Sequence, residues 1–340
     1  MRTCRGLTLV EVLVVIAVLA TLLGILAPAL SGARSAAQEA GCAATQDQLF
    51  VAAMQWAFDH RDQIPGVNTS GGHLHGNPAN QLALAGDTHA ASPTTSFDWM
   101  SPSLGAAAEL SSNRAERTRQ LFDRFACPSA ARLNDTLWGW SPDIADFQEI
   151  HESEGFPQIS YLSPASFHLY GPTGGRPPIG LHYGWIGPVV TPESYRPRLD
   201  RLGTQPASKI FLADGTRYVA SSGVLDFDVS IAPQYFGSFT SSGPIYVAST
   251  AYGVSRYLAS AAERGGRPPI AQGEPQHNRD LSYRHRGGLG SLRFDGSFVL
   301  MSELETKQNA APWHPSGSVF TGFRATPEAS ETHEEGEILW

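Results

Sequence analysis

The sequence MRTCRGLTLVEVLVVIAVLATLLGILAPAL, residues 1–30, determines how the rest of the chain is organised. From Leu7 to Leu30 it holds one charged side chain, that of Glu11, among Leu, Val, Ile and Ala. A helix rises about 1.5 Å per residue, so this run is long enough to cross a bilayer core of about 30 Å. The stretch is therefore a membrane-spanning helix or an export signal.

Glu11 decides between these readings. Ala27, Pro28 and Ala29 would suit the cut site of an ordinary secretory signal, which has an apolar core without charges. An acidic side chain in an apolar span costs about 2.5 kcal/mol on insertion scales, and less near the membrane face. A residue that costs so much indicates a specific role.

The order Gly-Leu-Thr-Leu-Val-Glu, with Arg2 and Arg5 before it and the apolar run after it, resembles the signal of type IV prepilins and type II secretion pseudopilins. The resemblance implies that a prepilin peptidase cuts between Gly6 and Leu7 and that the new amino terminus is methylated. It also implies that Glu11 acts in assembly with other pilin or pseudopilin subunits. Next to the amine of a neighbouring helix the buried carboxylate is paired, which favours one register of stacking.

Charge predicts the orientation of the span. Arg2 and Arg5 precede it, whereas Arg34 and Glu39 follow it. Basic residues stay on the cytoplasmic side, so we expect a single-pass protein of the inner membrane with a cytoplasmic amino terminus and an exported body. A plain signal anchor and a cleaved secretory signal remain as alternatives.

Composition describes the rest of the 340-residue chain. Only 16% of residues are charged, and 34 Gly and 24 Pro indicate a loop-rich, β-containing body rather than a helical bundle. The formal net charge is −8, and no basic patch favours nucleic acid as a partner. We therefore predict an α+β fold, a pilin-like lollipop in which a long helix packs on a mainly antiparallel sheet.

The apolar pattern continues beyond the span at helical spacing. The predicted buried stripe consists of Cys42, Leu49, Ala53 and Trp56, widened by Phe50, Ala57 and Phe58. The expected organisation is a leader at 1–6, a transmembrane helix at 7–30, an amphipathic continuation at 31–65, an exported body at 66–325 and a tail at 326–340.

This segment also resembles prepilin-like proteins of planctomycete-type bacteria. The matching positions are Arg34, Cys42, Leu49, Trp56, Asp59, Asp62 and Pro65. The resemblance covers about the first 65 residues.

Cysteine usage allows one bridge. Cys4 leaves with the leader, so Cys42 and Cys127 remain in an oxidising compartment. They form either one disulfide between stem and body or two unpaired buried thiols.

Several segments of the body read as regular structure. Lys209 to Ala213 predicts a buried strand, residues 218–229 and 245–248 predict further strands, and residues 251–264 predict a helix. The strongest signal is SLRFDGSFVLMS, in which Asp295 and Gly296 predict a two-residue hairpin turn.

The stretch RHRGGLGSLRFDGSFVLM resembles a carboxy-terminal signature of the same prepilin-like families. The matching residues, to which we assign a structural role, are His285, Gly287, Gly288, Phe294, Asp295 and Gly296. The strand ending at Asp214 and Gly215 resembles the strand that precedes this signature.

No catalytic, metal or cofactor site is predicted. The chain has no nucleophile elbow, no HExxH and no phosphate-binding loop. His285 with Asp295 or Asp214 could form a base and its orienter, but we favour a structural role for all three. His73, His75 and His89 fall in a polar loop without further convincing zinc ligands, and no acidic spacing specifies calcium.

We therefore expect a structural subunit of a type IV pilus-like or type II secretion pseudopilus filament. One alternative is a membrane-tethered module that binds a surface glycan or protein through the aromatic middle of the chain, from Trp138 to Trp185. The other is an exported hydrolase built on His285 and Asp295. The tail, with five Glu between 326 and 340, should be disordered.

Overall fold

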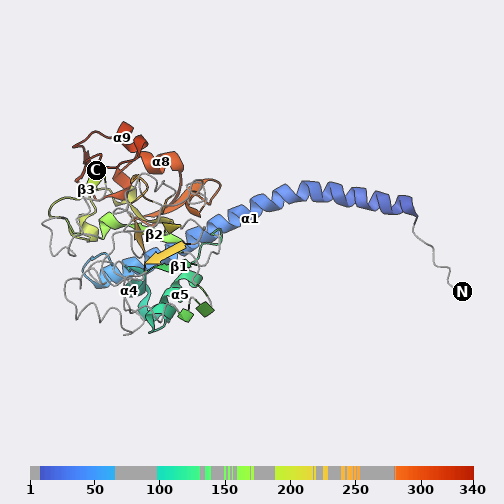
Figure 1. Cartoon of the computed structure of the whole chain (residues 1–340), viewed down its shortest axis with the longest axis horizontal. Helices are drawn as coiled ribbons and strands as arrows, with labels where there is room; N and C mark the ends of the chain where they lie inside the picture. Colours follow the sequence, from blue (N-terminus) through green and yellow to red (C-terminus); the bar gives the residue numbers. More distant parts are fainter. Residues whose placement is uncertain are drawn as a thin grey trace.

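The computed structural model describes part of the chain. The described residues are 8–65, 98–130, 135–138, 149–150, 152–153, 155, 159–168, 170–171, 188–216, 218–219, 225–228, 239–241, 243–247, 249, 251–252, 279 and 281–340. Figure 1 shows one long helix, α1, that projects from a body made of the remaining elements. The chain is thus an α+β lollipop, as its sequence predicts.

The helices are α1 (Leu9–Asp59), α4 (Met100–Leu104), α5 (Arg114–Arg124), α8 (Glu303–Gln308) and α9 (Pro327–Thr332). The strands are β1 (Asp135–Trp138), β2 (Tyr161–Pro164), β3 (Val189–Val190), β4 (Ile210–Asp214), β5 (Tyr218–Val219), β6 (Leu225–Asp228), β7 (Thr240–Ser241), β8 (Gly288–Arg293), β9 (Phe298–Ser302), β10 (Ser318–Phe320) and β11 (Ile338–Leu339). Five short 3-10 helices complete this part, at Gly105–Ala108, Ala165–Phe167, Leu199–Arg201, Pro206–Ser208 and Ala311–Trp313.

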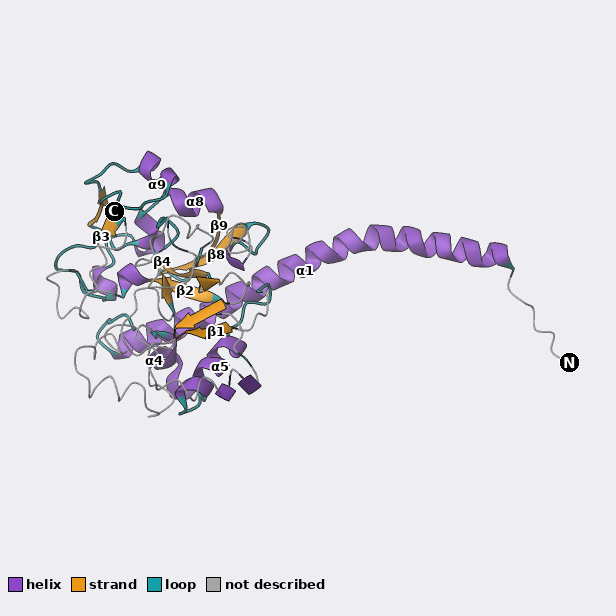
Figure 2. Ribbon diagram, in the orientation of Figure 1, coloured by secondary structure: helices purple, strands orange, loops and turns teal. Residues whose placement is uncertain are grey.

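The main sheet has five strands in the order β7-β2-β4-β8-β9. The pairs β2–β4, β4–β8 and β8–β9 are antiparallel, and only β2–β7 is parallel. Strands β3, β10 and β11 form a small antiparallel sheet, and β1, β6 and β5 form a third. Figure 2 shows the body end of α1 beside the main sheet, where the core lies.

The helix α1 is 51 residues long and runs unbroken through Pro28. The sequence places a kink-prone proline here, and Figure 1 shows the exposed part of the helix curving gently. Thr8 caps its amino end and His60 follows its last turn. One element therefore carries both the apolar span and the amphipathic segment.

Phe211 of β4 forms the centre of the aromatic core. Its ring packs edge-on against Phe50 of α1 at 5.7 Å, Trp99 at 5.3 Å and Phe294 at 5.2 Å between centroids. Phe167 packs on Phe294 at 5.0 Å. The stem, the sheet and the carboxy-terminal hairpin thus share one core.

The structure corrects some local predictions. The stretch 218–229 contains two short antiparallel strands, β5 and β6, instead of one. Of the described residues 245–247, only Tyr246 makes a bridge, to Ala325. Nearly all of the helix expected at 251–264 lies outside the described residues.

The tail is ordered, which corrects the expectation of disorder. Thr326 caps α9 by accepting a hydrogen bond from the backbone N–H of Ala329, and Leu339 is buried in β11. His333 Nε2 accepts from the Ala310 N–H at 3.0 Å. The cap and the buried side chains of Ala329 and Leu339 outweigh the repulsion between the like charges, which remain on the surface.

Candidate functional site

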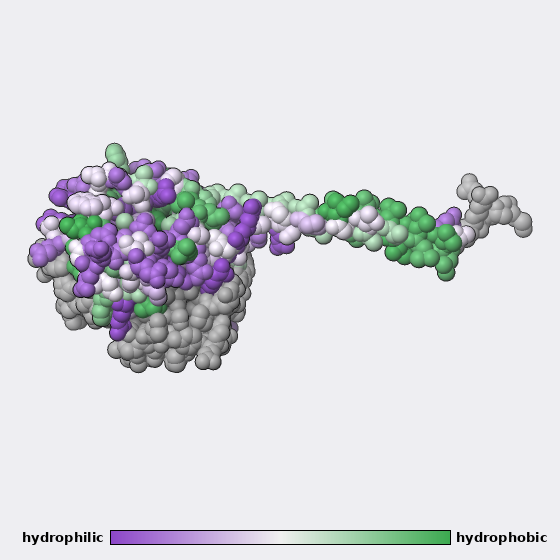
Figure 3. Space-filling model, turned by 90° about the horizontal axis from the view of Figure 1, so that it is seen from above, coloured by the Kyte–Doolittle hydropathy of each residue, from purple (hydrophilic) through white to green (hydrophobic). Residues whose placement is uncertain are grey.

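The exposed part of α1 is a continuous apolar surface. Its large apolar side chains from Leu9 to Leu30 expose between 44% and 76% of their surface, and Figure 3 shows this half of the stem in green. Among the described residues, α1 is the one helix long and apolar enough to cross a membrane. This segment fits a single-pass membrane anchor, since such a surface is unfavourable in water.

Glu11 closes the amino end of this helix. Its Oε2 accepts hydrogen bonds from the backbone N–H and the hydroxyl of Thr8, both at 2.8 Å, while Thr8 Oγ1 accepts from the Glu11 N–H at 3.3 Å. This arrangement is a capping box. We expect Glu11 to have a partner on a neighbouring subunit, and within the chain it also binds Thr8. Gly6 and Leu7 lie outside the described residues.

The body end of α1 packs one face on the sheet. The buried residues of this face are Cys42, Gln46, Leu49, Ala53 and Ala57. Phe58, expected in the stripe, is 79% exposed, and Trp56 is half-buried and stacks on His60 at 3.9 Å. Positions 56 and 58 flank the buried row, so they fall beside the contact rather than in it. A polar residue, Gln46, occupies the middle of that row.

Cys42 and Cys127 form a disulfide, with their Cα atoms 5.0 Å apart. Both cysteines are buried, and the bridge joins α1 to the segment that follows α5. The backbone N–H of Cys127 donates to Ser160 Oγ at 3.0 Å. Of the two possibilities left by the sequence, the structure has the bridge.

Asp214, at the end of β4, is the centre of a buried polar cluster. Its Oδ1 accepts from Arg284 Nη2 at 3.0 Å and from Gln46 Nε2 at 3.2 Å. Its Oδ2 accepts from the Gly290 N–H at 2.9 Å and lies 3.1 Å from His285 Nε2. The carboxylate is thus paired and fully hydrogen-bonded, as a buried charge must be.

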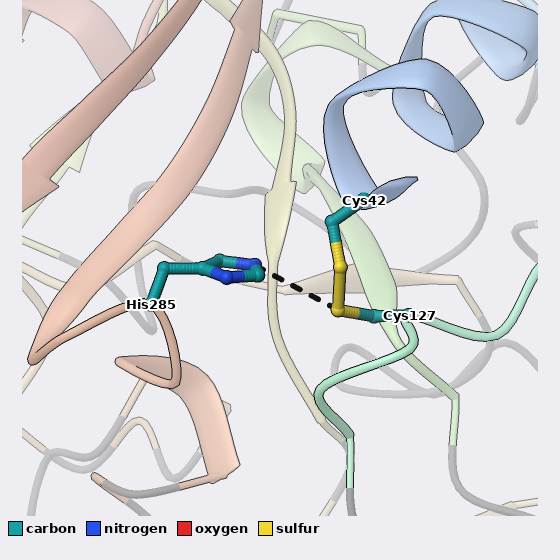
Figure 4. A group of neighbouring side chains, drawn as sticks. All are labelled: Cys42, Cys127 and His285. Atoms are coloured by element: carbon teal, nitrogen blue, oxygen red, sulfur yellow. Dashed lines mark hydrogen bonds between the residues drawn. A yellow bond between two sulfur atoms is a disulfide. The ribbon is translucent and has the colours of Figure 1, made fainter. Parts of the chain in front are cut away.

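His285 connects this cluster to the disulfide. Its Nε2 lies 3.7 Å from Cys127 Sγ, as Figure 4 shows, and its backbone pairs with Gly288 in a tight turn. Arg286 and Gly287 in that turn have φ of 55° and 81°. A glycine is favoured where the chain enters this left-handed region. We call the set Cys42, Gln46, Cys127, Asp214, Arg284 and His285 the stem–body junction.

Gly290, in the middle of β8, lies where there is no room for a side chain. A Cβ on Gly290 would lie 2.8 Å from Asp214 Oδ2 and 2.9 Å from the ring of Phe298. Any side chain there would displace the carboxylate that receives the junction's hydrogen bonds. The Gly-rich part of the signature therefore serves close approach of the backbone to Asp214.

Asp295 and Gly296 lie in the hairpin turn between β8 and β9. The Arg293 N–H donates to Ser297 O at 3.0 Å, which leaves a three-residue loop instead of the predicted two-residue turn. Gly296 has a φ of 83°, and Asp295 Oδ1 accepts from the N–H and hydroxyl of Ser297. Such loops combine a type I turn with a left-handed glycine.

Of the two carboxylates considered as partners of His285, the structure places Asp214 beside it and Asp295 away from it. Strand β8 lies between His285 and Asp295, which rules these two out as one acid–base pair. His285 does meet Asp214, but the same Nε2 faces both the carboxylate and the sulfur. A base that activates a thiol needs its second nitrogen for the orienting carboxylate. The geometry supports a structural rather than a catalytic cluster.

Sequence reasoning missed Gln46, Arg284 and Tyr161. Arg284 lies over the Tyr161 ring at 5.9 Å, and burial, followed by the charge of Asp214, raises the pKa of Tyr161. Gln46 could have been found as the polar residue one turn after Cys42 in the stripe. The partners of Arg284 depend on the fold, and no local pattern indicates them.

The aromatic middle is partly described. Tyr161 and Phe167 are fully buried, so they belong to the core and offer no stacking surface. His73, His75 and His89 lie outside the described residues.

Comparison with known proteins gives one match. The family described as the prokaryotic N-terminal methylation motif matches residues 1–27. No curated protein and no solved structure matches the chain. The chain therefore carries a prepilin-like amino-terminal signal, which indicates a structural subunit rather than an enzyme.

Proposed function

We propose that the chain is a prepilin- or pseudopilin-like subunit that assembles into a type IV pilus-like or type II secretion pseudopilus filament. A prepilin peptidase removes residues 1–6, the new terminus at Leu7 is methylated, and the apolar stem holds the subunit in the inner membrane before assembly. The amino terminus faces the cytoplasm, and the body from residue 66 onward is exported.

One observation carries this proposal: the match to the methylation motif coincides with a helix whose apolar side chains are exposed along its whole span. A signal peptide that is only cut away would not need to continue into a helix packed on the body. Here residues 9–59 form one element, which supports a span that stays with the body when the leader is removed. The membrane anchor and the packed stem are then parts of one subunit.

The rival functions have less support in the described residues. A glycan-binding module needs exposed aromatic rings, whereas Tyr161 and Phe167 are buried. A hydrolase built on His285 and Asp295 needs both in one site, and Asp295 instead binds Ser297 in a turn.

Replacing Gly6 with valine tests the processing step. We expect Gly6→Val to keep its leader when co-expressed with a prepilin peptidase, because a branched side chain obstructs the cut site. Gly24→Val is the matched control, since a Cβ at Gly24 meets no atom within 4 Å. Intact mass measures the result. Normal leader removal from Gly6→Val would contradict the assigned cut.

A further inference from the structure

The stem–body junction gathers metal-ligating atoms. The sulfurs of Cys42 and Cys127 and a ring nitrogen of His285 all lie within 4.8 Å of one another. A carboxylate oxygen, Asp214 Oδ2, adds a further ligand atom 3.1 Å from His285 Nε2. All four side chains are buried. Two sulfurs, an imidazole and a carboxylate are the ligand types that zinc takes in proteins.

We propose that, as long as Cys42 and Cys127 are thiols, the junction binds one thiophilic divalent metal ion of the zinc type. Both sulfurs and His285 Nε2 are ligands, and Asp214 Oδ2 is the fourth. The disulfide and the metal ion are then alternative ways of fastening the stem helix to the body. This proposal concerns the folded chain alone and does not depend on filament assembly.

The distances suit a tetrahedral site. With bonds of about 2.0–2.3 Å, neighbouring ligand atoms lie about 3.3–3.8 Å apart. His285 Nε2 lies 3.7 Å from Cys127 Sγ and 3.1 Å from Asp214 Oδ2. The two sulfurs must move apart, and a sulfur must approach Asp214, whose carboxylate lies outside the group of ligand atoms within 4.8 Å of one another. Figure 4 shows Cys127 in a loop and Cys42 on a helix, so rotation of the loop cysteine supplies that movement.

The charges at the junction balance when a divalent ion is bound. Two thiolates and Asp214 supply three negative charges, and the ion with Arg284 supplies three positive ones. Arg284 Nη2 and Gln46 Nε2 bind Oδ1 of Asp214, which leaves Oδ2 facing His285. The Gly290 N–H at 2.9 Å orients that oxygen. Hydrogen bonds of this kind hold metal ligands in place.

The chemistry needs no reductant, because a newly made chain carries thiols. Metal binding displaces one proton from each thiol, and His285 binds the ion through the lone pair of Nε2. Later oxidation passes two electrons from the thiolates to a disulfide oxidant. That oxidant takes up two protons from water as it becomes a dithiol, and the S–S bond replaces the released ion.

Cobalt binding to the full chain tests the proposal. The chain carries Cys4→Ser, so that Cys42 and Cys127 are its only cysteines, and is kept in detergent micelles. A phosphine reduces the bridge by giving it two electrons, while water supplies two protons and the oxygen of the phosphine oxide. We expect one Co²⁺ per reduced chain, a sulfur-to-cobalt charge-transfer band and displacement by Zn²⁺. The oxidised chain should show no such band.

Variants identify the ligands. His285→Gln should weaken binding roughly tenfold or more, whereas His60→Gln, an exposed control, should leave it unchanged. Zn²⁺ should also raise the melting temperature of the reduced chain and leave that of the oxidised chain unaltered. This last measurement needs no variant at position 285. A reduced chain that shows neither the band nor the shift would overturn the proposal, as would equal affinity in His285→Gln.

Discussion

The carboxylate of Glu11 is bound twice by Thr8 at the exposed end of α1. Both hydrogen bonds are 2.8 Å long, and they satisfy Glu11 Oε2 within one chain. In the proposed filament, the amine of a neighbouring stem gives this carboxylate a charged partner as well. A capped carboxylate is less unfavourable in an apolar environment than a bare one, so the cap helps the unassembled subunit to tolerate Glu11.

Replacing Glu11 separates insertion from assembly. Glu11→Leu should insert into the membrane at least as well as the unaltered chain, because the charge is gone, and should assemble poorly because the pairing with the neighbour is lost. Glu11→Gln keeps a hydrogen-bonding side chain at the cap and should also assemble poorly. Membrane fractionation and the yield of sheared filaments measure the two steps. Assembly of Glu11→Leu at the unaltered level would rule out the pairing.

His168 makes stability depend on pH. Burial lowers its pKa to about 4, and its Nδ1 donates to Pro65 O at 2.8 Å. The unfolded chain takes up this proton near pH 6.5, well before the folded chain does, so acid favours unfolding between these values.

The free energy of unfolding should therefore fall by about 3 kcal/mol between pH 7 and pH 4 because of His168. His314, whose pKa burial lowers to about 3, acts in the same direction. His168→Gln can still donate to Pro65 and should show a smaller loss. Denaturant unfolding at both pH values measures it, and equal acid sensitivity in the variant would contradict this origin.

The stem helix is fastened to the body at three successive turns. Cys42 forms the disulfide, Gln46 binds Asp214 and Gly290, and Phe50 packs on Phe211 and the turn at Gly296. The signature from His285 to Gly296 therefore holds the body end of α1 against the sheet. This explains why it combines a histidine, close-packed glycines and a hairpin turn.

Removing the disulfide measures how much this bond contributes to the free energy of unfolding. Cys42→Ala with Cys127→Ala should lower the free energy of unfolding by about 4 kcal/mol, since the bridge closes a long loop with a sequence separation of 85. Urea unfolding of the two forms, with a chelator present, gives the difference. A change below about 1 kcal/mol would show that the hydrogen bonds and Phe50 hold the stem without the bridge.

The tail belongs to the body through β11. Leu339 is 1% exposed and pairs with Ser318 of β10. Leu339→Ala should cost about 2–3 kcal/mol of stability, as for other buried leucines, whereas Ile338→Ala, at a side chain 49% exposed, should cost much less. Thermal unfolding compares the two variants. Equal and small effects would mean that the tail is not part of the folded body.

Over the whole molecule, the sequence predicts what local periodicity and composition determine. The apolar helix and strand β4 follow from such patterns and are confirmed, whereas the stem helix ends at Asp59 instead of continuing to residue 65. The buried roles of Gln46 and Arg284 could not be predicted, because both depend on hydrogen bonds to Asp214, which lies on a strand distant in sequence. The prediction of a disordered tail was wrong, because it rested on the charges alone and left out the cap at Thr326 and the burial of Leu339.

The intact mass of the chain isolated from its native membrane shows whether it is processed as a prepilin. The proposed subunit should begin at Leu7, carry one added methyl group and keep α1 attached to the body. A chain that still begins at Met1 would contradict prepilin processing and leave a signal anchor. A chain that begins near Ser31 would contradict the membrane stem altogether.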